Sequence, residues 1–352
     1  MLRLHSWRVS PYSAKVRSYL RWKGVPFEDV APSVRVLAST IRSAVGKAIM
    51  PTVLLDDGTW LQDSSEIIDT LETRLPGVSI TPPGDRQRLV NLLLELHGDE
   101  WLPMVALHYR WNKPENRAFA MHEFGRDGFP WVPGPLARLM VRPVAKRMQS
   151  YLPVLGIDEV TSGGLEFYTL GLLKQLDAHF AEHPYLFGTR PALADFALYG
   201  PLWAHLYRDV GTTKLFEDLP HLQSWITRML TPTGEPGAFL EDDAVPPTLE
   251  PILARLLAEQ GAYVKQVVDA INAWCDEHPD ATRIPRSLGP TEFTVGGVTG
   301  TRRLLTEQLW MVQRPLDVVT PSSLEWIRRL GPLEWSPRHR VVRRNYKVVL
   351  AR

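Results

Sequence analysis

Met1-Leu-Arg-Leu-His-Ser-Trp7, followed by Ser10-Pro-Tyr-Ser13, is the part of this chain that most strongly indicates its fold. The first run has the apolar pattern of a short strand, and the second places a serine and a proline where a helix begins. Free N–H groups and partial positive charge at a helix N-terminus favour an anion such as a thiolate, to which Ser10 could donate a hydrogen bond. The alternative for Ser10 is a simple helix cap, a role that serine often fills.

A second element is Met50-Pro51, which opens the apolar run Thr52-Val-Leu-Leu55. Proline at a strand start removes a backbone donor, and the peptide bond before a proline can be cis. With a cis bond, the backbone N–H and C=O of Met50 would turn outward and could pair with a peptide-like ligand. The alternative is an ordinary trans proline at the edge of a strand.

The third element is Asp63-Ser64-Ser65-Glu66, which follows a hairpin signal at Asp57-Gly58 and precedes apolar residues at helical spacing. Small polar residues at a helix start can hold a carboxylate through backbone N–H groups and a hydroxyl. A plain N-cap with Glu66 completing a capping box is the alternative, and both roles can coexist.

Together these elements make residues 1–80 resemble the thioredoxin-fold half of the cytosolic glutathione transferases. The run at Ser10 is similar to the Cys-Pro-Tyr/Phe motif of glutaredoxins and omega-class transferases, with serine in place of cysteine. The resemblance implies a β-α-β unit, a connecting helix and a β-β-α unit. It implies that Ser10 stabilises the thiolate, with Tyr12 and Ser13 as fallback hydroxyls. The glutathione-binding residues that it implies are Met50, Pro51, Asp63 and Ser64.

The second half supports the same family through Gly188-Thr-Arg-Pro-Ala-Leu-Ala-Asp-Phe196, which resembles the motif before its central helix. Ala192 stands where the family has a capping hydroxyl, so we expect one capping bond to be missing and Asp195 to cap locally. The fold class is therefore α+β. We expect a thioredoxin-like domain (1–80), an all-α substrate domain (85–232) and a small mixed C-terminal extension (248–352). Residues 112–162 look like an insertion, and the acceptor is expected to contact Trp101, Met104 and His108.

Composition agrees with a soluble intracellular enzyme. The chain has 352 residues, 44% of them hydrophobic, and a formal net charge of +1, so no general attraction to nucleic acid or membrane is expected. Cys275 is the single cysteine, which excludes an intramolecular disulfide and a dithiol redox pair. We find no metal-ligand pattern, no signal peptide and no apolar span of membrane length, so a cytoplasmic location is expected.

The two added segments carry basic residues. A basic amphipathic stretch at 136–152 is interpreted as a helix packed over the substrate cleft, with contact to an anionic membrane or partner as the alternative. In the extension we expect a strand and turn at 293–298, a helix at 302–314 and a basic strand at 341–350. The tail cations, with Trp335 and Tyr346, could track a nucleic acid, but a solvated strand face is favoured.

The resemblance implies attack of glutathione thiolate on a small hydrophobic electrophile, with glutathione as co-substrate and no metal. It also implies a homodimer, and we expect no nucleic-acid partner and no stable membrane insertion. Two alternatives stay open. One is a non-catalytic binding or scaffold protein with the same fold, and the other is a glutathione-dependent lyase or isomerase.

Overall fold

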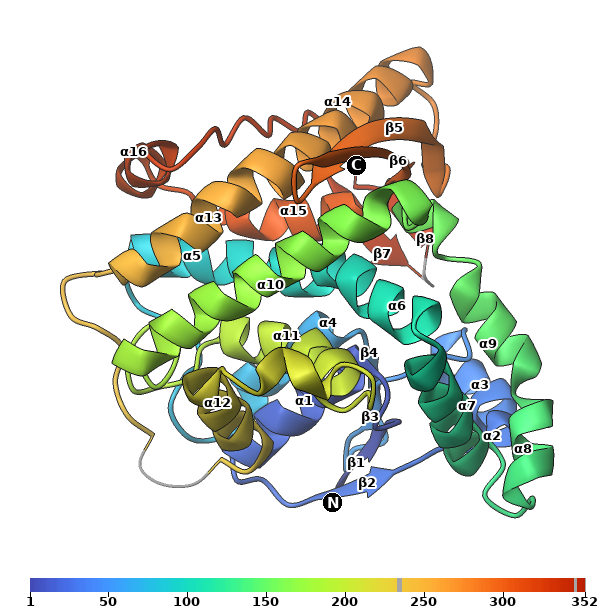
Figure 1. Ribbon diagram of the computed structural model, residues 1–352. Helices are drawn as coiled ribbons and strands as arrows, with labels where there is room; N and C mark the ends of the chain where they lie inside the picture. Colours follow the sequence, from blue (N-terminus) through green and yellow to red (C-terminus); the bar gives the residue numbers. More distant parts are fainter. Residues whose placement is uncertain (233–235, 345–346, 352) are drawn as a thin grey trace.

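The fold is α+β, as predicted, with a small mixed sheet near the N-terminus and a mostly helical remainder. The computed structural model describes residues 1–232, 236–344 and 347–351. In Figure 1 the N-terminal sheet and α1 lie at the bottom, the long helix α10 crosses the middle, and the C-terminal elements form the upper layer.

The N-terminal part follows the predicted order of a β-α-β unit, a connecting helical segment and a β-β-α unit. Its four-stranded sheet has the order β2-β1-β3-β4, with β2 parallel to β1 and the other pairs antiparallel. The elements are β1 (Leu2–His5), α1 (Pro11–Trp22), β2 (Phe27–Val30), α2 (Val34–Val36), η1 (Leu37–Ile41), α3 (Arg42–Val45), β3 (Thr52–Leu54), β4 (Trp60–Gln62) and α4 (Ser64–Arg74).

The helical part follows after a loop and is built around a buried central helix, α11, that packs against α1 and α5. Asp195 accepts hydrogen bonds from the N–H groups of Ala192 and Leu186, so it caps α11 without a hydroxyl at position 192. The elements are α5 (Asp85–Leu96), η2 (His97–Trp101), α6 (Leu102–Asn112), α7 (Pro114–Gly128), α8 (Gly134–Met140), α9 (Arg142–Gln149), η3 (Pro153–Leu155), α10 (Glu159–Glu182), α11 (Leu193–Pro201), η4 (Leu202–Tyr207), η5 (Thr213–Phe216) and α12 (Pro220–Leu230).

The C-terminal elements pack on α5 and α10 rather than forming a separate body (Figure 1). Their apolar side chains join the same core as those of the N-terminal sheet and of α10. The elements are η6 (Pro247–Leu249), α13 (Glu250–Leu256), η7 (Leu257–Gly261), α14 (Ala262–Glu277), β5 (Ser287–Val295), β6 (Val298–Leu305), α15 (Gln308–Asp317), α16 (Pro321–Arg328), β7 (Val341–Arg344) and β8 (Lys347–Leu350).

Two predictions for the C-terminal segment are corrected by the structure. The helix predicted at 302–314 is wrong over residues 302–307, because β6 runs to Leu305, where it pairs with β5 across a Gly296-Gly297 turn, and α15 begins only at Gln308. The single basic strand predicted at 341–350 is a hairpin, β7 and β8, whose positions 345 and 346 lie outside the described residues. In both places cross-strand pairing, which no local sequence pattern records, decides the structure.

The basic tail is partly neutralised within the fold. Arg338 pairs with Asp276, and Arg340 pairs with Asp317 at 2.6 Å. The side chains of Arg343, Arg344, Tyr346 and Lys347 fall outside the described residues. The two described ion pairs favour the interpretation of the tail as a solvated face.

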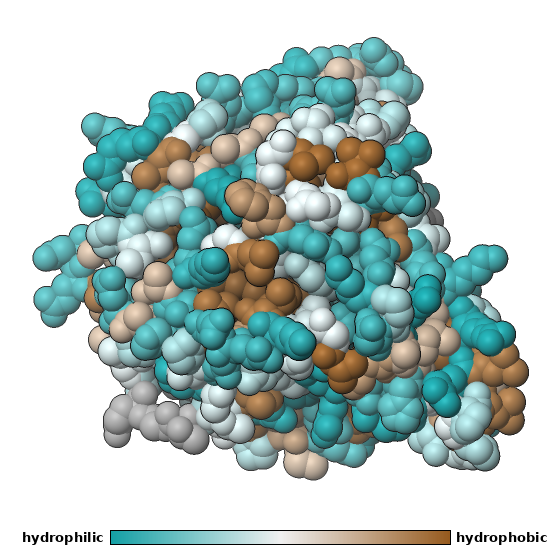
Figure 2. All heavy atoms as spheres, in the orientation of Figure 1, coloured by the Kyte–Doolittle hydropathy of each residue, from teal (hydrophilic) through white to brown (hydrophobic). Residues whose placement is uncertain are grey.

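The face seen in Figure 2 is largely hydrophilic, with brown apolar areas near its centre, at the upper right and at the lower right, where Figure 1 shows α8. Within the described part of the chain, no helix combines the length and apolar character needed to cross a bilayer.

Gly200 allows α11 to approach α1 closely, because a Cβ there would lie 2.6 Å from the Pro11 carbonyl oxygen. We expect Gly200→Ala to lower the free energy of unfolding by about 1–3 kcal/mol, since the two helices must separate. Gly163→Ala is the matched control, because no heavy atom lies within 4 Å of that added Cβ. It should raise stability by about 0.5–1 kcal/mol through helix propensity. Denaturant unfolding measures both, and equal effects would contradict the close-approach argument.

Candidate functional site

The register of the sheet brings the three sequence-predicted segments to one end. His5 pairs with Thr52, and Thr52 pairs with Gln62, so the last residue of β1, the first of β3 and the last of β4 lie side by side. Three segments therefore lie at the same end of the sheet: the segment that leaves β1 toward Ser10, the segment that enters β3 and the segment that leaves β4. Residues far apart in sequence become neighbours there.

Ser10 caps α1 and keeps its own proton available. Its side-chain oxygen accepts a hydrogen bond from the Ser13 N–H at 3.2 Å, and the residue is half-buried. The other two predicted hydroxyls are placed differently. The Tyr12 hydroxyl donates to the Asp99 carbonyl oxygen at 2.9 Å, and Ser13 is buried with no hydrogen-bond partner for its hydroxyl among the described residues. Ser10 is partly exposed at the N-terminus of α1, and among the described residues its hydroxyl donates no hydrogen bond, whereas the Tyr12 hydroxyl donates one to Asp99 and Ser13 is buried.

The Met50–Pro51 peptide bond is cis, which was one of the two alternatives for this proline. Pro51 is buried at the start of β3, and Met50 is half-buried beside it. Within the described residues, no hydrogen bond engages the backbone N–H or C=O of Met50. These two groups are therefore available to the main chain of a peptide-like ligand.

Asp63 and Ser64 begin α4 in an unusual backbone conformation. Asp63 has φ 70° and ψ 128°, a region that costs a non-glycine residue about 1–3 kcal/mol and clusters at ligand sites. Its carboxylate accepts from the Ser65 N–H at 3.0 Å, which fixes the first turn. Ser64 is 4% exposed, and its hydroxyl has no hydrogen-bond partner among the described residues. The start of α4 thus presents a hydroxyl and free N–H groups that suit a carboxylate.

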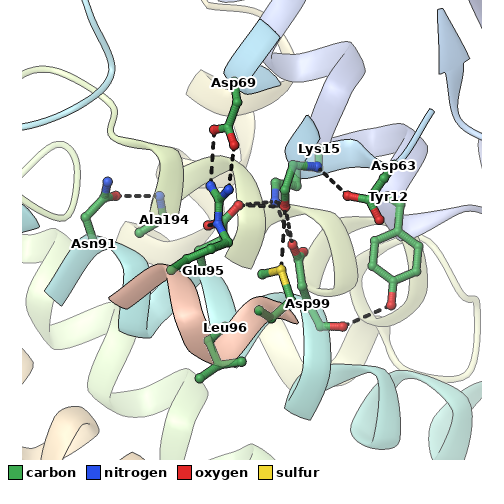
Figure 3. A network of polar contacts seen from close by, with 12 residues as sticks. Tyr12, Lys15, Asp63, Asp69, Asn91, Glu95, Leu96, Asp99 and Ala194 are labelled. Carbon is green, nitrogen blue, oxygen red and sulfur yellow. Dashed lines mark hydrogen bonds and ion pairs between the residues drawn. The ribbon is translucent and has the colours of Figure 1, made fainter. Parts of the chain in front are cut away.

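Directly behind this helix start lies a buried charge cluster that the sequence analysis missed (Figure 3). The ammonium group of Lys15, from α1, lies 2.9 Å from Glu95 and 2.6 Å from Asp99 and donates to the Ser65 hydroxyl at 3.0 Å. Ser65 in turn donates to Glu95 at 2.7 Å. Ser65 is committed to this cluster, so Ser64 is the serine left for a ligand.

Arg314 from α15 extends the cluster into the C-terminal segment. Its guanidinium donates to Glu95 at 2.9 Å and pairs with Asp69 of α4 at 2.5 Å (Figure 3). Burial disfavours the charged form of Glu95, but Lys15 and Arg314 outweigh it and lower its pKa to about 2. Burial raises the pKa of Asp99 to about 6 against the pull of Lys15. The pKa values of the two carboxyl groups therefore shift in opposite directions, because only Glu95 has a second cation beside it.

A buried arginine, Arg110, holds the chain just before Ser10. Arg110 of α6 donates to the Val9 carbonyl oxygen at 2.7 Å and to both carboxylate oxygens of Asp209, at 2.7 and 2.8 Å. Arg110 and Asp209 are both buried. This contact fixes the approach of the β1–α1 segment from the helical side. A charged residue within an otherwise apolar helix face is the signal that would have identified both Lys15 and Arg110.

The three residues predicted to contact the acceptor lie in the core. Trp101 is 1% exposed, Met104 0% and His108 2%. The ring of His108 contacts Glu166 at 3.3 Å, and burial lowers its pKa. Apolar and aromatic residues at helical spacing mark a core as readily as a cleft, which is why the sequence pattern alone did not distinguish them. An acceptor would reach these side chains only if the packing opened.

Met50 instead belongs to a separate apolar cluster that joins the N-terminal part to the insertion. Trp7 and Val9 are fully buried members, and Met50 and Trp60 pack against it from the edge. This cluster lies beside the segments that flank Ser10. Among the described residues, no group of three or more His, Cys, Asp or Glu side chains is arranged to hold a metal ion.

Two family models match the chain. The model described as glutathione S-transferase, N-terminal domain, covers residues 4–79, and the C-terminal domain model of the same family covers residues 169–231. The first match contains all three segments at the end of the sheet, and the second contains α11 and its Asp195 cap. No curated protein matches the chain.

Solved structures that match the chain have low sequence identity to it. A glutathione S-transferase from Rhodospirillum rubrum F11 is 19% identical, with a TM-score of 0.43, and the match covers 69% of this chain and 98% of that one. One from Methylobacterium radiotolerans, in complex with glutathione sulfonate, is 21% identical with a TM-score of 0.42, over 69% and 99%. The β-etherase LigF from Sphingobium sp. strain SYK-6 is 19% identical with a TM-score of 0.42, over 65% and 94%.

Lys15→Met tests the buried charge cluster. Removing the ammonium group leaves Glu95 and Asp99 close together without their shared cation, so we expect the free energy of unfolding to fall by about 3–5 kcal/mol. Lys174→Met, at an exposed position of α10, is the control and should change stability by less than about 0.5 kcal/mol. Denaturant unfolding of both variants gives the comparison. Equal, small losses would show that the cluster does not depend on Lys15.

Proposed function

We propose that this chain is a member of the glutathione S-transferase superfamily that binds glutathione at the end of the sheet and directs its thiolate at a small hydrophobic electrophile. The observation that supports the proposal is that the segments carrying Ser10, Met50 and Ser64 adjoin three neighbouring strand ends, His5, Thr52 and Gln62. These residues carry the Ser10 hydroxyl proton, the Met50 backbone N–H and C=O and the Ser64 hydroxyl, none of which is used in a hydrogen bond among the described residues.

The peptide part of glutathione suits the groups around β3 and α4. The free N–H and C=O of Met50 would pair with the ligand backbone in the manner of an added strand. The γ-glutamyl carboxylate would lie at the start of α4, against the Ser64 hydroxyl and the backbone N–H groups, with Asp63 near the γ-glutamyl amino group. Pro51 shapes the turn that presents Met50.

The thiol would lie at the N-terminus of α1. Because the Ser10 oxygen already accepts from the Ser13 N–H, its proton is free to be donated to a sulfur anion. The helix end adds partial positive charge, and both effects lower the pKa of a thiol from about 8.5. The thiolate would then attack an electrophilic carbon, forming a C–S bond while the leaving group departs with the bonding electron pair.

The acceptor would approach from the apolar cluster beside Met50. Trp60, Leu107 and Met148 pack against that cluster while remaining partly exposed. Such side chains suit a small apolar electrophile better than the enclosed Trp101 does. The homodimer and the cytoplasmic location implied by the family resemblance complete this proposal, and sedimentation of the full-length chain tests the first.

A second candidate is a protein that binds glutathione without transferring it. It is favoured by the burial of Trp101, Met104 and His108, which removes the expected acceptor contacts. A glutathione-dependent lyase or isomerase would use the same thiolate on another substrate. Thiol binding is common to all three, so binding and turnover must be measured separately.

Ser64→Ala tests the binding site. Loss of the hydroxyl from the carboxylate position should raise the Kd for glutathione at least about tenfold, the equivalent of 1.4 kcal/mol. Ser224→Ala, at an exposed position of α12, should leave the Kd unchanged. Titration calorimetry on the full-length chain gives both values. Failure of the wild type to bind millimolar glutathione would exclude the proposal and all its glutathione-dependent variants.

Ser10→Ala tests the chemistry. With the hydroxyl gone, the pKa of bound glutathione should rise and kcat with an activated aromatic halide should fall about 10²- to 10³-fold, as when a preorganised donor is removed. Ultraviolet absorbance of the bound thiolate against pH reads the pKa directly. Retained binding with unchanged kcat would remove Ser10 from the mechanism. Bound glutathione without turnover in the wild type would favour the non-catalytic candidate.

A further inference from the structure

The insertion exposes a compact group of large apolar side chains. Trp131 is 64% exposed, Leu136 50%, Leu139 49% and Met140 41%, all within ten residues of sequence. Of the other exposed large hydrophobics of the described chain, Val160, Phe167 and Leu170 lie on α10, Met1 at the N-terminus and Val210 in the loop after η4. Isolated exposed apolar residues are ordinary, whereas a gathered group marks an interaction site.

These side chains do not serve the fold. The buried residues of the α8–α9 segment are Ala137, Val141 and Ala145, spaced by four, and backbone bonds of 3.1 and 3.0 Å join them in one helical row. Leu136 and Leu139 lie on the other side of the same helix. The segment therefore has a small-residue inner face against the protein and a large apolar outer face against water. Figure 2 shows this outer face as brown atoms at the lower right corner.

The charge around this face has one sign. Residues 128–157 contain no aspartate or glutamate, while the whole chain is close to neutral at +1. Arg138, Arg142, Lys146 and Arg147 all lie in this stretch and are exposed. The described residues provide no carboxylate partner for the first three of these cations. Four exposed cations concentrated beside an apolar face are electrostatically complementary to an anionic surface.

A basic groove borders the apolar face. It lies between α7 and α9, has a volume of about 390 Å³ and is open to solvent. Arg117, Arg142 and Lys146 line it, together with Gln149 and small or apolar side chains, and none of its lining residues is a carboxylate. A groove of this kind suits a phosphate-bearing headgroup, whose charge three cations would surround.

We propose that the loop at Trp131 with α8 and α9 is a docking face for the surface of an anionic phospholipid bilayer. Trp131, Leu136, Leu139 and Met140 enter the boundary between headgroups and acyl chains, and the cations contact lipid phosphates. The attachment is peripheral, because α8 has seven residues and α9 eight, far fewer than a membrane-spanning helix needs. Tryptophan at the tip of a proline-flanked loop is the side chain that prefers this boundary.

Other macromolecules fit the face less well. A nucleic acid would meet the cations but leave the aliphatic side chains Leu136, Leu139 and Met140 in water, since base recognition uses aromatic stacking. A neutral protein partner would cover the apolar residues without balancing the charge. The combination of an aliphatic face, a tryptophan and an acid-free basic border is that of an interfacial amphipathic helix.

Flotation of the full-length chain with lipid vesicles tests the proposal. Wild type should bind vesicles of phosphatidylcholine mixed with phosphatidylserine at least about tenfold more tightly than phosphatidylcholine alone, and added salt should weaken this binding. Equal binding to both vesicles, or none to either, would overturn the proposal. Tighter binding to single-stranded RNA than to the anionic vesicles would also overturn it and assign the face to nucleic acid.

Matched variants separate the two parts of the face. Leu136→Ser with Leu139→Ser should lower vesicle binding at least about tenfold, because the aliphatic burial is lost. Phe167→Ser with Leu170→Ser removes two exposed apolar residues of α10 and should leave binding unchanged. Arg142→Gln with Lys146→Gln should lower both the affinity and its salt dependence, whereas Lys174→Gln with Lys214→Gln should not. A control pair that weakens binding as much as its test pair would contradict the assignment.

Unfolding does not confound this test. The substituted side chains point to solvent, so each variant should keep the wild-type melting temperature. If the leucine pair nevertheless unfolds, Trp131→Ser alone replaces it, because a loop side chain 64% exposed contributes little to the core. Unchanged vesicle binding by a folded Trp131→Ser would then count against the proposal.

Discussion

The ammonium group of Lys15, enclosed between Glu95 and Asp99, is the interaction on which the arrangement of this molecule depends. A charge removed from water is costly unless partners in good geometry compensate it. Those partners come from α5 and η2, and the Ser65 hydroxyl that joins them comes from α4. α1 and α4, whose N-termini form the candidate glutathione site, are thereby held at fixed positions against the helical part. A site assembled from separate helix ends needs such a constraint, since small displacements of those ends would separate its groups.

The C-terminal segment is bound to the rest of the chain through two arginines, the half-buried Arg314 and the buried Arg302, whose charges are compensated in different ways. Arg314 completes the carboxylate cluster, where it gives Glu95 its second cation. Arg302 has no hydrogen-bond partner for its guanidinium among the described residues and lies 3.9 Å from the ring centroid of Tyr263 and 5.3 Å from that of Trp101. Ring faces attract a desolvated cation. Trp101 thus has a structural role at this joint, which explains why it is enclosed rather than open to an acceptor.

Local sequence signals predicted the elements whose ends are marked locally. Ser10-Pro11 marked the start of α1, Asp57-Gly58 marked the β3–β4 hairpin, and the order of the N-terminal elements followed from them. What local signals do not contain is pairing across the chain. Lys15 contacts partners 80 and 84 positions away in the sequence. Ser64 and Ser65 cannot be distinguished by the sequence pattern, because only the fold shows that Ser65 belongs to the charge cluster. Arg302 lies in a strand because β5 pairs with that strand. The buried charges could have been suspected from their apolar neighbours, but their partners could not.

The insertion connects the two proposals physically. Two residues of its inner row, Val141 and Ala145, belong to the apolar cluster that contains Trp7 and Val9 and that Met50 borders. The outer row of the same segment is the face we assign to the bilayer surface. A small hydrophobic electrophile partitions into lipid because its apolar surface leaves water there. The proposed enzyme, attached by α8, would therefore meet its acceptor at higher local concentration, with one helical segment separating the lipid boundary from the cluster beside the proposed thiol site. Attachment to the bilayer and binding of the acceptor would then depend on opposite faces of one helical segment, residues 134–149.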